Sequence, residues 1–243
     1  MVWRSSARLP KRSICSHSNV SYLGDALSER LGEFIQLRRD IHRHPELAFE
    51  EHRTSDLVAA KLAGWGYAVH RGLGGTGVVG VLKKGSSNRC LGIRADMDAL
   101  PIQETTGLDW ASSKPGLMHA CGHDGHTAML LAAAKAIALD ASFDGTLNLI
   151  FQPAEEGGGG AVRMMDDGLF DQHPCDAVFA CTTCRARLRG TLCFVMVRRW
   201  HRATTSPSAF MAQAATAPCR TVRLIPWWQI GRASCRERVY LAV

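Results

Sequence analysis

The spacing of apolar residues predicts an amphipathic helix near the start of the chain. Apolar positions there recur at the interval of one helix face: Leu27, Leu31, Phe34 and Ile35. The helix is expected over residues 27–42 and ends before Pro45, which cannot continue an α-helix. Further helices are expected from Thr54 and, rich in alanine and leucine, from Asp124.

Short apolar runs between these helices predict β-strands. Four are expected, over residues 76–83, 90–101, 145–156 and 175–180, the first buried on both faces, and a further helix begins at 159. Alternating helices and strands predict an α/β domain with a mostly parallel sheet. In such sheets ligands bind where strands end and loops begin. The polar residues with the most chemistry fall at those points.

Composition divides the chain into two unlike parts near residue 180. The 243 residues carry a formal net charge of +7, but residues 181–243 contain 11 arginines, no lysine and one acid, Glu237, and so contribute +10. Residues 1–24 are basic and serine-rich, and we expect them to be disordered. The segment expected to fold is therefore 25–180. No apolar run approaches the roughly 20 residues of a membrane span.

One turn of the chain, CGHDGH, gathers possible metal ligands. Cys121 and His123 supply a thiolate and an imidazole two residues apart, which suit Zn²⁺, and imidazole also suits Mn, Co and Ni. Taken alone, the pair is more typical of a buried cysteine beside a hydrogen-bonded histidine. Asp124 and His126 in the same turn favour the metal, because a core rarely buries so many polar groups together.

Two pairs of carboxylates fall at predicted strand ends. Adjacent residues of an extended chain point in different directions, so one of Glu155 and Glu156 could bind metal while the other moves protons. A solvated strand end is the alternative. Asp96 and Asp98 share a face if their strand continues, and could orient a ligand histidine. Capping or ion-pair roles fit that pair equally well.

Four motifs in a fixed order carry a resemblance to a known family. They are RRDIHRHPELAFEE, GIRADMDALPI, MHACGHDGHTAMLL and QPAEEGGGGA, and the resemblance covers about residues 27–180. The family is that of metal-dependent amidohydrolases and peptidases, which includes hippurate hydrolases, N-acyl-amino-acid amidohydrolases and auxin-conjugate hydrolases. The resemblance implies a zinc-peptidase-like α/β catalytic domain with an inserted lid.

The resemblance also implies chemistry for particular residues. Cys121, His123 and Glu156 resemble metal ligands, and Glu155 resembles the general base. The site residues expected to support them are Asp96, Asp98, Asp124 and His126. The family uses two divalent ions, with zinc or manganese expected here and cobalt or nickel as alternatives. It hydrolyses the amide bond of N-acyl amino acids, so we expect a small-molecule substrate and neither nucleic acid nor membrane as partner.

The family pattern stops after DAVFA, where Leu-His-Asn should follow and CTTCRARLRG stands instead. If the underlying codons are read one base out of register, the genetic code allows Leu-His-Asn-Met-Pro-Gly over residues 180–186. Over residues 213–228 the same shift allows GGHGAMPHRTVDPVV, which resembles the family's lid motif. The end of the chain, IGRASCRERV, resembles a translated sequencing adapter. We therefore expect residues 181–243 to be a frame-shifted tail with little native structure. The family's lid domain is then not encoded in this reading frame, and we expect the chain to be a truncated, inactive fragment.

Two other functions fit parts of the sequence. The arginine-rich tail is typical of a basic protein that binds nucleic acid or membranes. Cys121, His123, Cys181 and Cys184 could instead form a structural zinc module. The family forms dimers or tetramers, whereas this chain is expected as a monomer or aggregate. Four cysteines before residue 180 and no secretory signal predict a cytoplasmic location.

Overall fold

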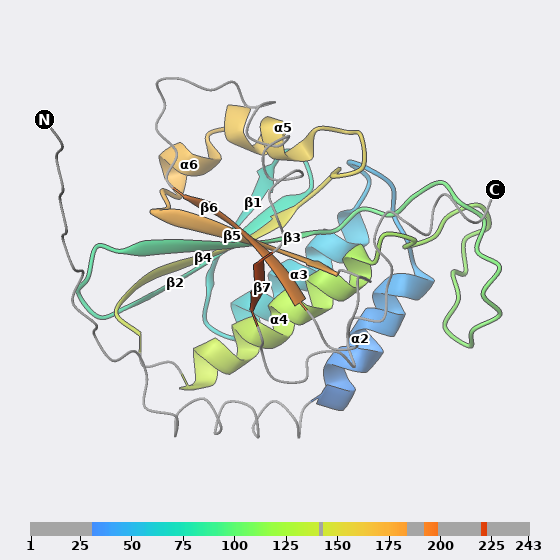
Figure 1. Cartoon of the computed structure of the whole chain (residues 1–243), viewed down its shortest axis with the longest axis horizontal. Coiled ribbons are helices and arrows are strands. Elements are labelled where there is room, and N and C mark those ends of the chain that lie inside the picture. The colour runs from blue at the N-terminus through green and yellow to red at the C-terminus, as the bar shows by residue number, and fades with distance from the viewer. Residues whose placement is uncertain (1–30, 141–142, 184–191, 199–219, 223–243) are drawn as a thin grey trace, which may run out of the picture.

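The computed structural model describes residues 31–140, 143–183, 192–198 and 220–222. Figure 1 shows a sheet flanked by helices. The helices are α2 (Leu31–Arg43), α3 (His52–Gly64), α4 (His123–Asp140), α5 (Gly160–Asp166) and α6 (Leu169–Gln172). The strands are β1 (Ala68–Leu73), β2 (Gly77–Lys84), β3 (Cys90–Asp96), β4 (Gly145–Gln152), β5 (Ala177–Thr183), β6 (Leu192–Arg198) and β7 (Arg220–Val222).

The sheet is mixed, with the order β1-β2-β4-β3-β5-β6-β7. The α/β class is confirmed. The expectation of a mostly parallel sheet is wrong, because only β4, β3 and β5 run parallel to one another and the remaining neighbours are antiparallel. The connections explain the difference. β3, β4 and β5 follow one another through α4 and through α5 and α6, whereas a tight turn joins β1 to β2 and forces an antiparallel pair.

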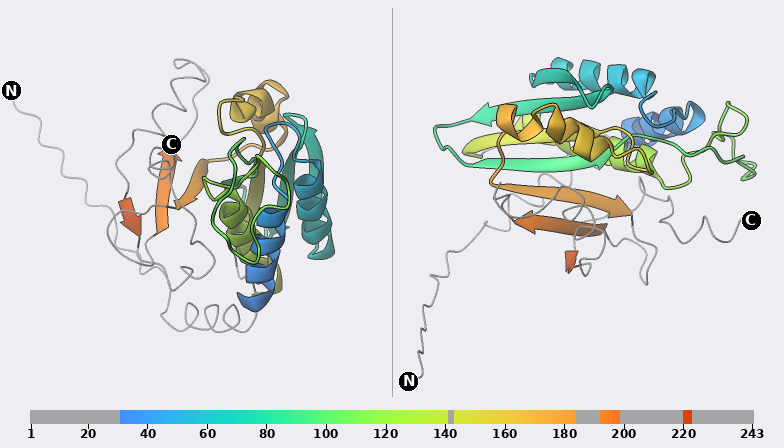
Figure 2. Two further views of the ribbon diagram at one scale, coloured as in Figure 1. Left: turned by 90° about the vertical axis from the view of Figure 1, so that its right-hand side faces the viewer. Right: turned by 90° about the horizontal axis from the view of Figure 1, so that it is seen from above.

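Helices cover both faces of the sheet, which gives the domain two apolar layers (Figure 2). Adjacent residues of a strand point to opposite faces. Val78 and Leu149 belong to the larger cluster, which they form with α2, α3 and α4. Val79 and Ile150 belong to the smaller one, with Met164 of α5 among its members. Because the larger cluster surrounds α4 with α2, α3 and the sheet, α4 is apolar around most of its circumference.

The predicted elements form, and two of the four predicted strands are shorter than expected. The helix expected from Asp124 begins one residue earlier, and α2 covers the described part of the first predicted helix. The strands expected over 90–101 and 145–156 end at Asp96 and Gln152, and loops follow. β2 is buried on both faces only in its first half. The residues beyond these two strand ends contain the polar groups of the candidate site.

The proposed boundaries at residues 24 and 180 remain predictions. Residues 1–30 lie outside the described part, and beyond 183 only β6 and β7 are described. Of the helices that the structure does describe, none has both the length and the apolar composition needed to cross a bilayer.

Candidate metal centre

The carboxyl ends of β3 and β4 bring the two predicted carboxylate pairs to one edge of the sheet. Asp96 and Gln152 are the last residues of these strands and are register partners. The backbone N–H of Met97 donates to the carbonyl of Gln152 over 3.0 Å, which keeps the two chains together as the strands end. Asp98 lies just beyond this point on one chain, and Glu155 and Glu156 on the other. The N-terminus of α4 approaches the same edge.

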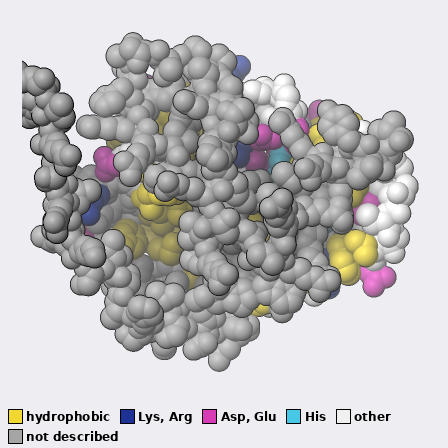
Figure 3. Space-filling model, in the orientation of Figure 1, with side chains coloured by type: hydrophobic (Ala, Val, Ile, Leu, Met, Phe, Trp, Pro, Cys, Tyr) yellow, Lys and Arg dark blue, Asp and Glu magenta, His cyan; other side chains and the backbone are white. Residues whose placement is uncertain are grey.

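The three predicted metal ligands converge at this edge. One donor atom from each of Cys121, His123 and Glu156 lies within 4.8 Å of the other two. Asp96, His123 and His126 form a second such group that shares His123. Cys121, His123, His126 and Asp96 are buried, and Glu156 is half-buried. The space-filling view shows a histidine next to acidic side chains on one face of the molecule (Figure 3).

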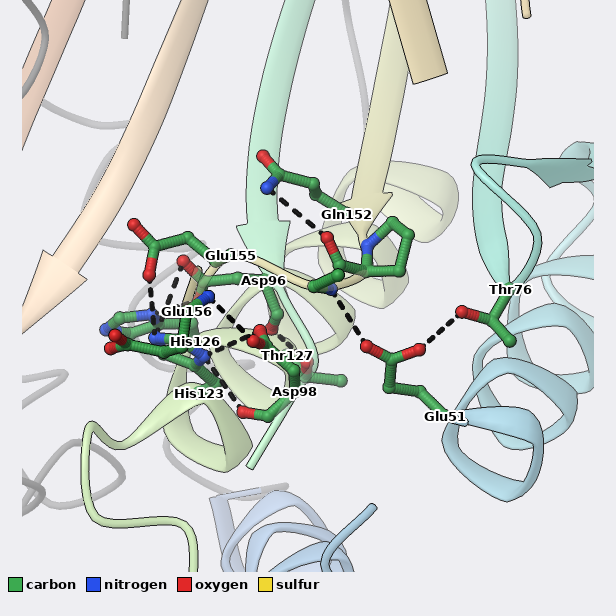
Figure 4. A network of polar contacts seen from close by, with 12 residues as sticks. Glu51, Thr76, Asp96, Asp98, His123, His126, Thr127, Gln152, Glu155 and Glu156 are labelled. Atoms are coloured by element: carbon green, nitrogen blue, oxygen red, sulfur yellow. Dashed lines mark hydrogen bonds and ion pairs between the residues drawn. The ribbon is translucent and has the colours of Figure 1, made fainter. Parts of the chain in front are cut away.

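Asp98 fixes the orientation of the His123 ring (Figure 4). The Nδ1 atom of His123 lies 2.9 Å from the backbone carbonyl of Asp98 and 3.1 Å from its carboxylate. The Nε2 atom therefore faces the other carboxylates, 3.7 Å from Asp96 and 3.9 Å from Glu155. An imidazole held through one nitrogen presents the other as a ligand, which is the usual arrangement around bound metals.

Asp96 contacts a second histidine and an arginine instead of facing solvent. Its carboxylate lies 2.5 Å from Nδ1 of His126 and 2.8 Å from the guanidinium of Arg94. Burial raises the pKa of Asp96, but Arg94, His123 and His126 outweigh burial and bring it well below its usual range. Asp96 is therefore an anion at neutral pH. Figure 4 shows it between the His126 ring and the end of β3.

The electrostatics of the cluster favour a bound cation. Burial lowers the pKa of His123, but the carboxylates of Asp96 and Asp98 outweigh it and raise the pKa to about 9. Burial, and the nearby Glu156 and Glu155, raise the pKa of the Cys121 thiol. A thiolate in this acidic surrounding needs a compensating positive charge. The sulfur, nitrogen and oxygen donors of Cys121, His123 and Glu156 fit a divalent ion such as Zn²⁺.

The loop that carries Glu155 and Glu156 is tightly folded. The backbone N–H of Glu156 donates to the Asp98 carboxylate over 2.8 Å. Two of the glycines that follow lie too close to neighbouring atoms to carry a side chain. A Cβ at Gly160 would lie 1.8 Å from the carbonyl oxygen of Pro153, and one at Gly158 would lie 2.7 Å from Cβ of Ala154. The run of glycines thus permits close packing of the loop on itself.

The pKa of Glu155 suits a group that exchanges protons. Burial raises the pKa of Glu155, and the negative charge of Asp96 raises it further, while Arg94 and His123 oppose the shift. Its side chain is 27% exposed, so it is accessible to solvent. A carboxyl with a raised pKa is better matched to proton transfer near neutral pH.

Asp124, predicted to support the cluster, is directed elsewhere. Its Oδ2 atom accepts from Nε of Arg38 over 2.9 Å and lies 2.8 Å from Nδ1 of His42, both on α2. The other ring nitrogen of His42 lies 3.3 Å from Glu104. Asp124 is in the first turn of α4, where a negative charge is favourable at the helix N-terminus. It therefore ties α2 to the start of α4, where His123 also lies.

Several functional residues were not predicted as site residues. Arg38 and His42 hold Asp124, Arg94 holds Asp96, and Glu51 binds the Glu155 loop through Ala154. Arg38, His42 and Glu51 lie within the RRDIHRHPELAFEE motif, and its polar residues were the available signal. The alternative zinc module depends on the side chains of Cys181 and Cys184, which lie outside the part of the structure that is described.

Comparison with known proteins gives the family. The model of Peptidase family M20/M25/M40 matches residues 92–222, which is more than half of the chain. The chain therefore belongs to this family, whose members are hydrolases.

Individual relatives are similar to more than half of the chain. The hippurate hydrolase of Campylobacter jejuni is 58% identical over 61% of this chain and 38% of the relative. The IAA-amino acid hydrolase ILR1-like 4 of Arabidopsis thaliana is 46% identical over 56% of this chain and 31% of the relative. The structure of Bacillus subtilis YXEP protein, described as a dinuclear metal binding peptidase, matches with a TM-score of 0.58 and 39% identity, over 64% of this chain and 43% of that one. The chain thus spans under two fifths of these curated relatives.

Proposed function

We propose that this chain carries the metal-binding half of an amidohydrolase active site whose whole enzyme hydrolyses N-acyl amino acids. The observation that carries the proposal is the convergence of Cys121, His123 and Glu156 within 4.8 Å, with the Glu155 carboxylate 3.9 Å from the His123 ring. Three different ligand types at one buried point, with a carboxyl of raised pKa beside them, suit metal-assisted hydrolysis.

Each residue then has a defined role. Cys121, His123 and Glu156 would hold a divalent ion, with zinc favoured by the thiolate and manganese, cobalt and nickel as alternatives. Metal ions, when bound, polarise the scissile carbonyl and make water more acidic. Glu155 accepts the proton of the attacking water and returns it to the leaving nitrogen. Asp98 holds the His123 ring, and Asp96 holds that of His126.

The substrate class follows from the relatives rather than from the described residues. Hippurate is N-benzoylglycine, and an IAA-amino acid is likewise an acyl group joined to an amino acid by an amide. Relatives of both kinds match more than half of this chain. We therefore assign a small N-acyl amino acid as substrate of the whole enzyme. Neither nucleic acid nor a membrane is required by this chemistry.

The chain alone is proposed to be inactive. Cys121, His123 and Glu156 could hold one ion, whereas a site with two ions needs more ligands than these three. The remaining ligands and the lid would be restored by the shifted reading frame after residue 180. Comparing hydrolysis by this chain with hydrolysis by the product of a frame-restored gene therefore shows whether the missing ligands and lid are needed for activity.

A hippurate assay tests the proposal. Both proteins are loaded with Zn²⁺ or Mn²⁺, and glycine release is followed. We expect release by the frame-restored protein, loss of that release in its Glu155→Gln variant, and none by the present chain. No release by the frame-restored protein, or activity that survives Glu155→Gln, would overturn the assignment. Salt-dependent nucleic-acid binding that persists after residues 1–180 are removed would favour the basic-protein alternative instead.

A further inference from the structure

Glu51 is a buried carboxyl that contacts the loop of the candidate site from a distant part of the sequence. It has no exposed surface. One carboxyl oxygen accepts from the backbone N–H of Ala154 over 2.8 Å, and the other accepts from the hydroxyl of Thr76 over 2.5 Å. Ala154 immediately precedes Glu155. Figure 4 shows Glu51 reaching from the start of α3 to this loop.

Helix capping does not explain the Glu51 carboxyl. Glu51 occupies the N-cap position of α3 but makes no side-chain hydrogen bond to that helix. Glu46 does this instead, because its carboxylate accepts from the backbone N–H groups of Arg53 and Thr54 and from the Thr54 hydroxyl. The Glu51 carboxyl is thus committed to Ala154 and Thr76.

Ala154 has a backbone conformation that needs support. Its φ is 50°, in the left-handed region that alanine rarely adopts, and it is fully buried. A strained residue keeps such a conformation only when its surroundings impose it. The hydrogen bond from its N–H to Glu51 and the bond from the N–H of Gly160 to its carbonyl, 3.0 Å, supply that constraint.

Two buried carboxyls therefore bracket Glu155. Glu51 binds the N–H of the residue before it, and Asp98 binds the N–H of the residue after it. We propose that Glu51 is a positioning residue, which holds Ala154 in its left-handed conformation and so sets the directions of Glu155 and Glu156 toward His123. This inference rests on the proposed function, because it assumes that these two glutamates serve the metal site.

The charge state of Glu51 makes glutamine its closest substitute. Burial raises the pKa of Glu51, the hydrogen bonds from Thr76 and Ala154 oppose that shift, and the charge of Asp98 adds to it. A glutamine has the same shape as the neutral carboxyl. Its carbonyl can accept from Ala154, and its amide can donate to the Thr76 hydroxyl. Leucine fills the same space without either contact.

The test measures cobalt binding by the full chain. Co²⁺ reports thiolate coordination by a charge-transfer band in the near ultraviolet, and its dissociation constant follows from titration. We expect Glu51→Leu to weaken Co²⁺ binding about 10- to 100-fold, as loss of supporting contacts does at other metal sites. Glu51→Gln should stay within about threefold of the unmodified chain, because it keeps the Ala154 contact. Circular dichroism without metal confirms that each variant folds.

Further variants keep the test decisive. If Glu51→Leu does not fold, Glu51→Asp replaces it, because the shorter side chain keeps its polarity but cannot span both contacts. Glycine adopts a positive φ without strain, so Ala154→Gly should reduce the effect of Glu51→Leu in a double-mutant cycle. Independent effects would overturn the role of Ala154.

The outcomes also separate this inference from the proposed function. A folded Glu51→Leu that binds Co²⁺ as tightly as the unmodified chain, or a Glu51→Gln as damaging as Glu51→Leu, overturns the inference and leaves the site intact. Absence of a thiolate band in the unmodified chain overturns both. Thr76→Val removes only the second partner of Glu51 and should stay within about threefold.

Discussion

Asp98 accepts a hydrogen bond of 2.8 Å from the backbone N–H of Glu156, 58 residues further along the chain. The same side chain lies 3.1 Å from Nδ1 of His123. One carboxylate thereby connects two of the three proposed metal ligands. Burial raises the pKa of Asp98, but the hydrogen bond and charge of His123 and the N–H groups of Glu156 and Glu155 outweigh it and lower the pKa. Asp98 therefore performs this role as an anion.

Removal of Asp98 should disorder the site without removing a ligand. We expect Asp98→Ala to weaken divalent-metal binding about 10- to 100-fold, because His123 and the Glu156 backbone both lose their partner. Isothermal titration with Zn²⁺ measures the change. Asp56→Asn is the matched control: this exposed carboxylate pairs with Arg71 and should leave affinity unchanged. Equal affinity in Asp98→Ala and the unmodified chain would contradict the connection.

The two adjacent glutamates should behave differently. Glu156→Gln removes a proposed ligand and is expected to lower Zn²⁺ affinity by about 100-fold, at the upper end of what loss of a supporting residue costs. Glu155→Gln changes the group assigned to proton transfer and should change affinity by no more than about threefold. Competition with a chromophoric chelator measures both. The division of roles is wrong if the two substitutions weaken binding equally.

His42 should give the chain a pH-dependent stability. Burial lowers its pKa, but Asp124 and Glu104 outweigh burial and raise it. Its protonated form therefore stabilises the folded chain fully below the unfolded value of about 6.5, and this contribution is lost as pH rises through the folded pKa. His42→Gln should cost about 1.5–3 kcal/mol at low pH, and less at alkaline pH.

Urea unfolding at about pH 5.5 and about pH 9, on either side of the ordinary histidine pKa, measures this difference. His52→Gln provides the control, since His52 is exposed on α3 and its substitution should change stability little at either pH. A cost of His42→Gln that is unchanged or larger at the alkaline pH would show that its protonation contributes nothing to folding.

The packing of the glycine-rich loop predicts a contrast between two glycines. Gly160→Ala places a Cβ against the Pro153 carbonyl and should cost about 1–3 kcal/mol or more of unfolding free energy. Gly64→Ala meets no atom within 4 Å in α3 and should gain up to about 1 kcal/mol. Thermal unfolding of both variants gives the comparison. Equal stabilities of the two variants would mean that the loop rearranges to accommodate a Cβ at position 160.

Local sequence patterns predicted most of the helices and strands but not the order of the strands in the sheet. The apolar spacing around Asp124 and in residues 76–83 reflects burial that is local to each element, so α4 and β2 could be predicted. The strand β1 was missed because most of its residues are exposed, and it has no alternating buried face. The antiparallel pairing of β2 with β4 depends on contacts between distant segments, which periodicity does not encode.

The residues of the candidate site also divide into those that local sequence patterns predicted and those that depend on distant contacts. Cys121 and His123 are close in sequence and share one turn, so their chemistry was visible there. Glu51 belongs to the RRDIHRHPELAFEE motif, but the motif does not reveal its partner, a backbone N–H 103 residues away. Asp124 was assigned to the cluster on sequence proximity alone. The direction of its side chain depends on Arg38 and His42 of α2, which the spacing of residues 121–126 cannot reveal.

The Co²⁺ absorption spectrum of the full chain tests the central claim most directly. A site made by Cys121, His123 and Glu156 should give a thiolate charge-transfer band that Cys121→Ser abolishes. The band should persist in Cys90→Ser, whose thiol lies near Asn148 and outside the cluster. A spectrum without that band, or a band that survives Cys121→Ser, would contradict the assignment of this cluster as a metal centre.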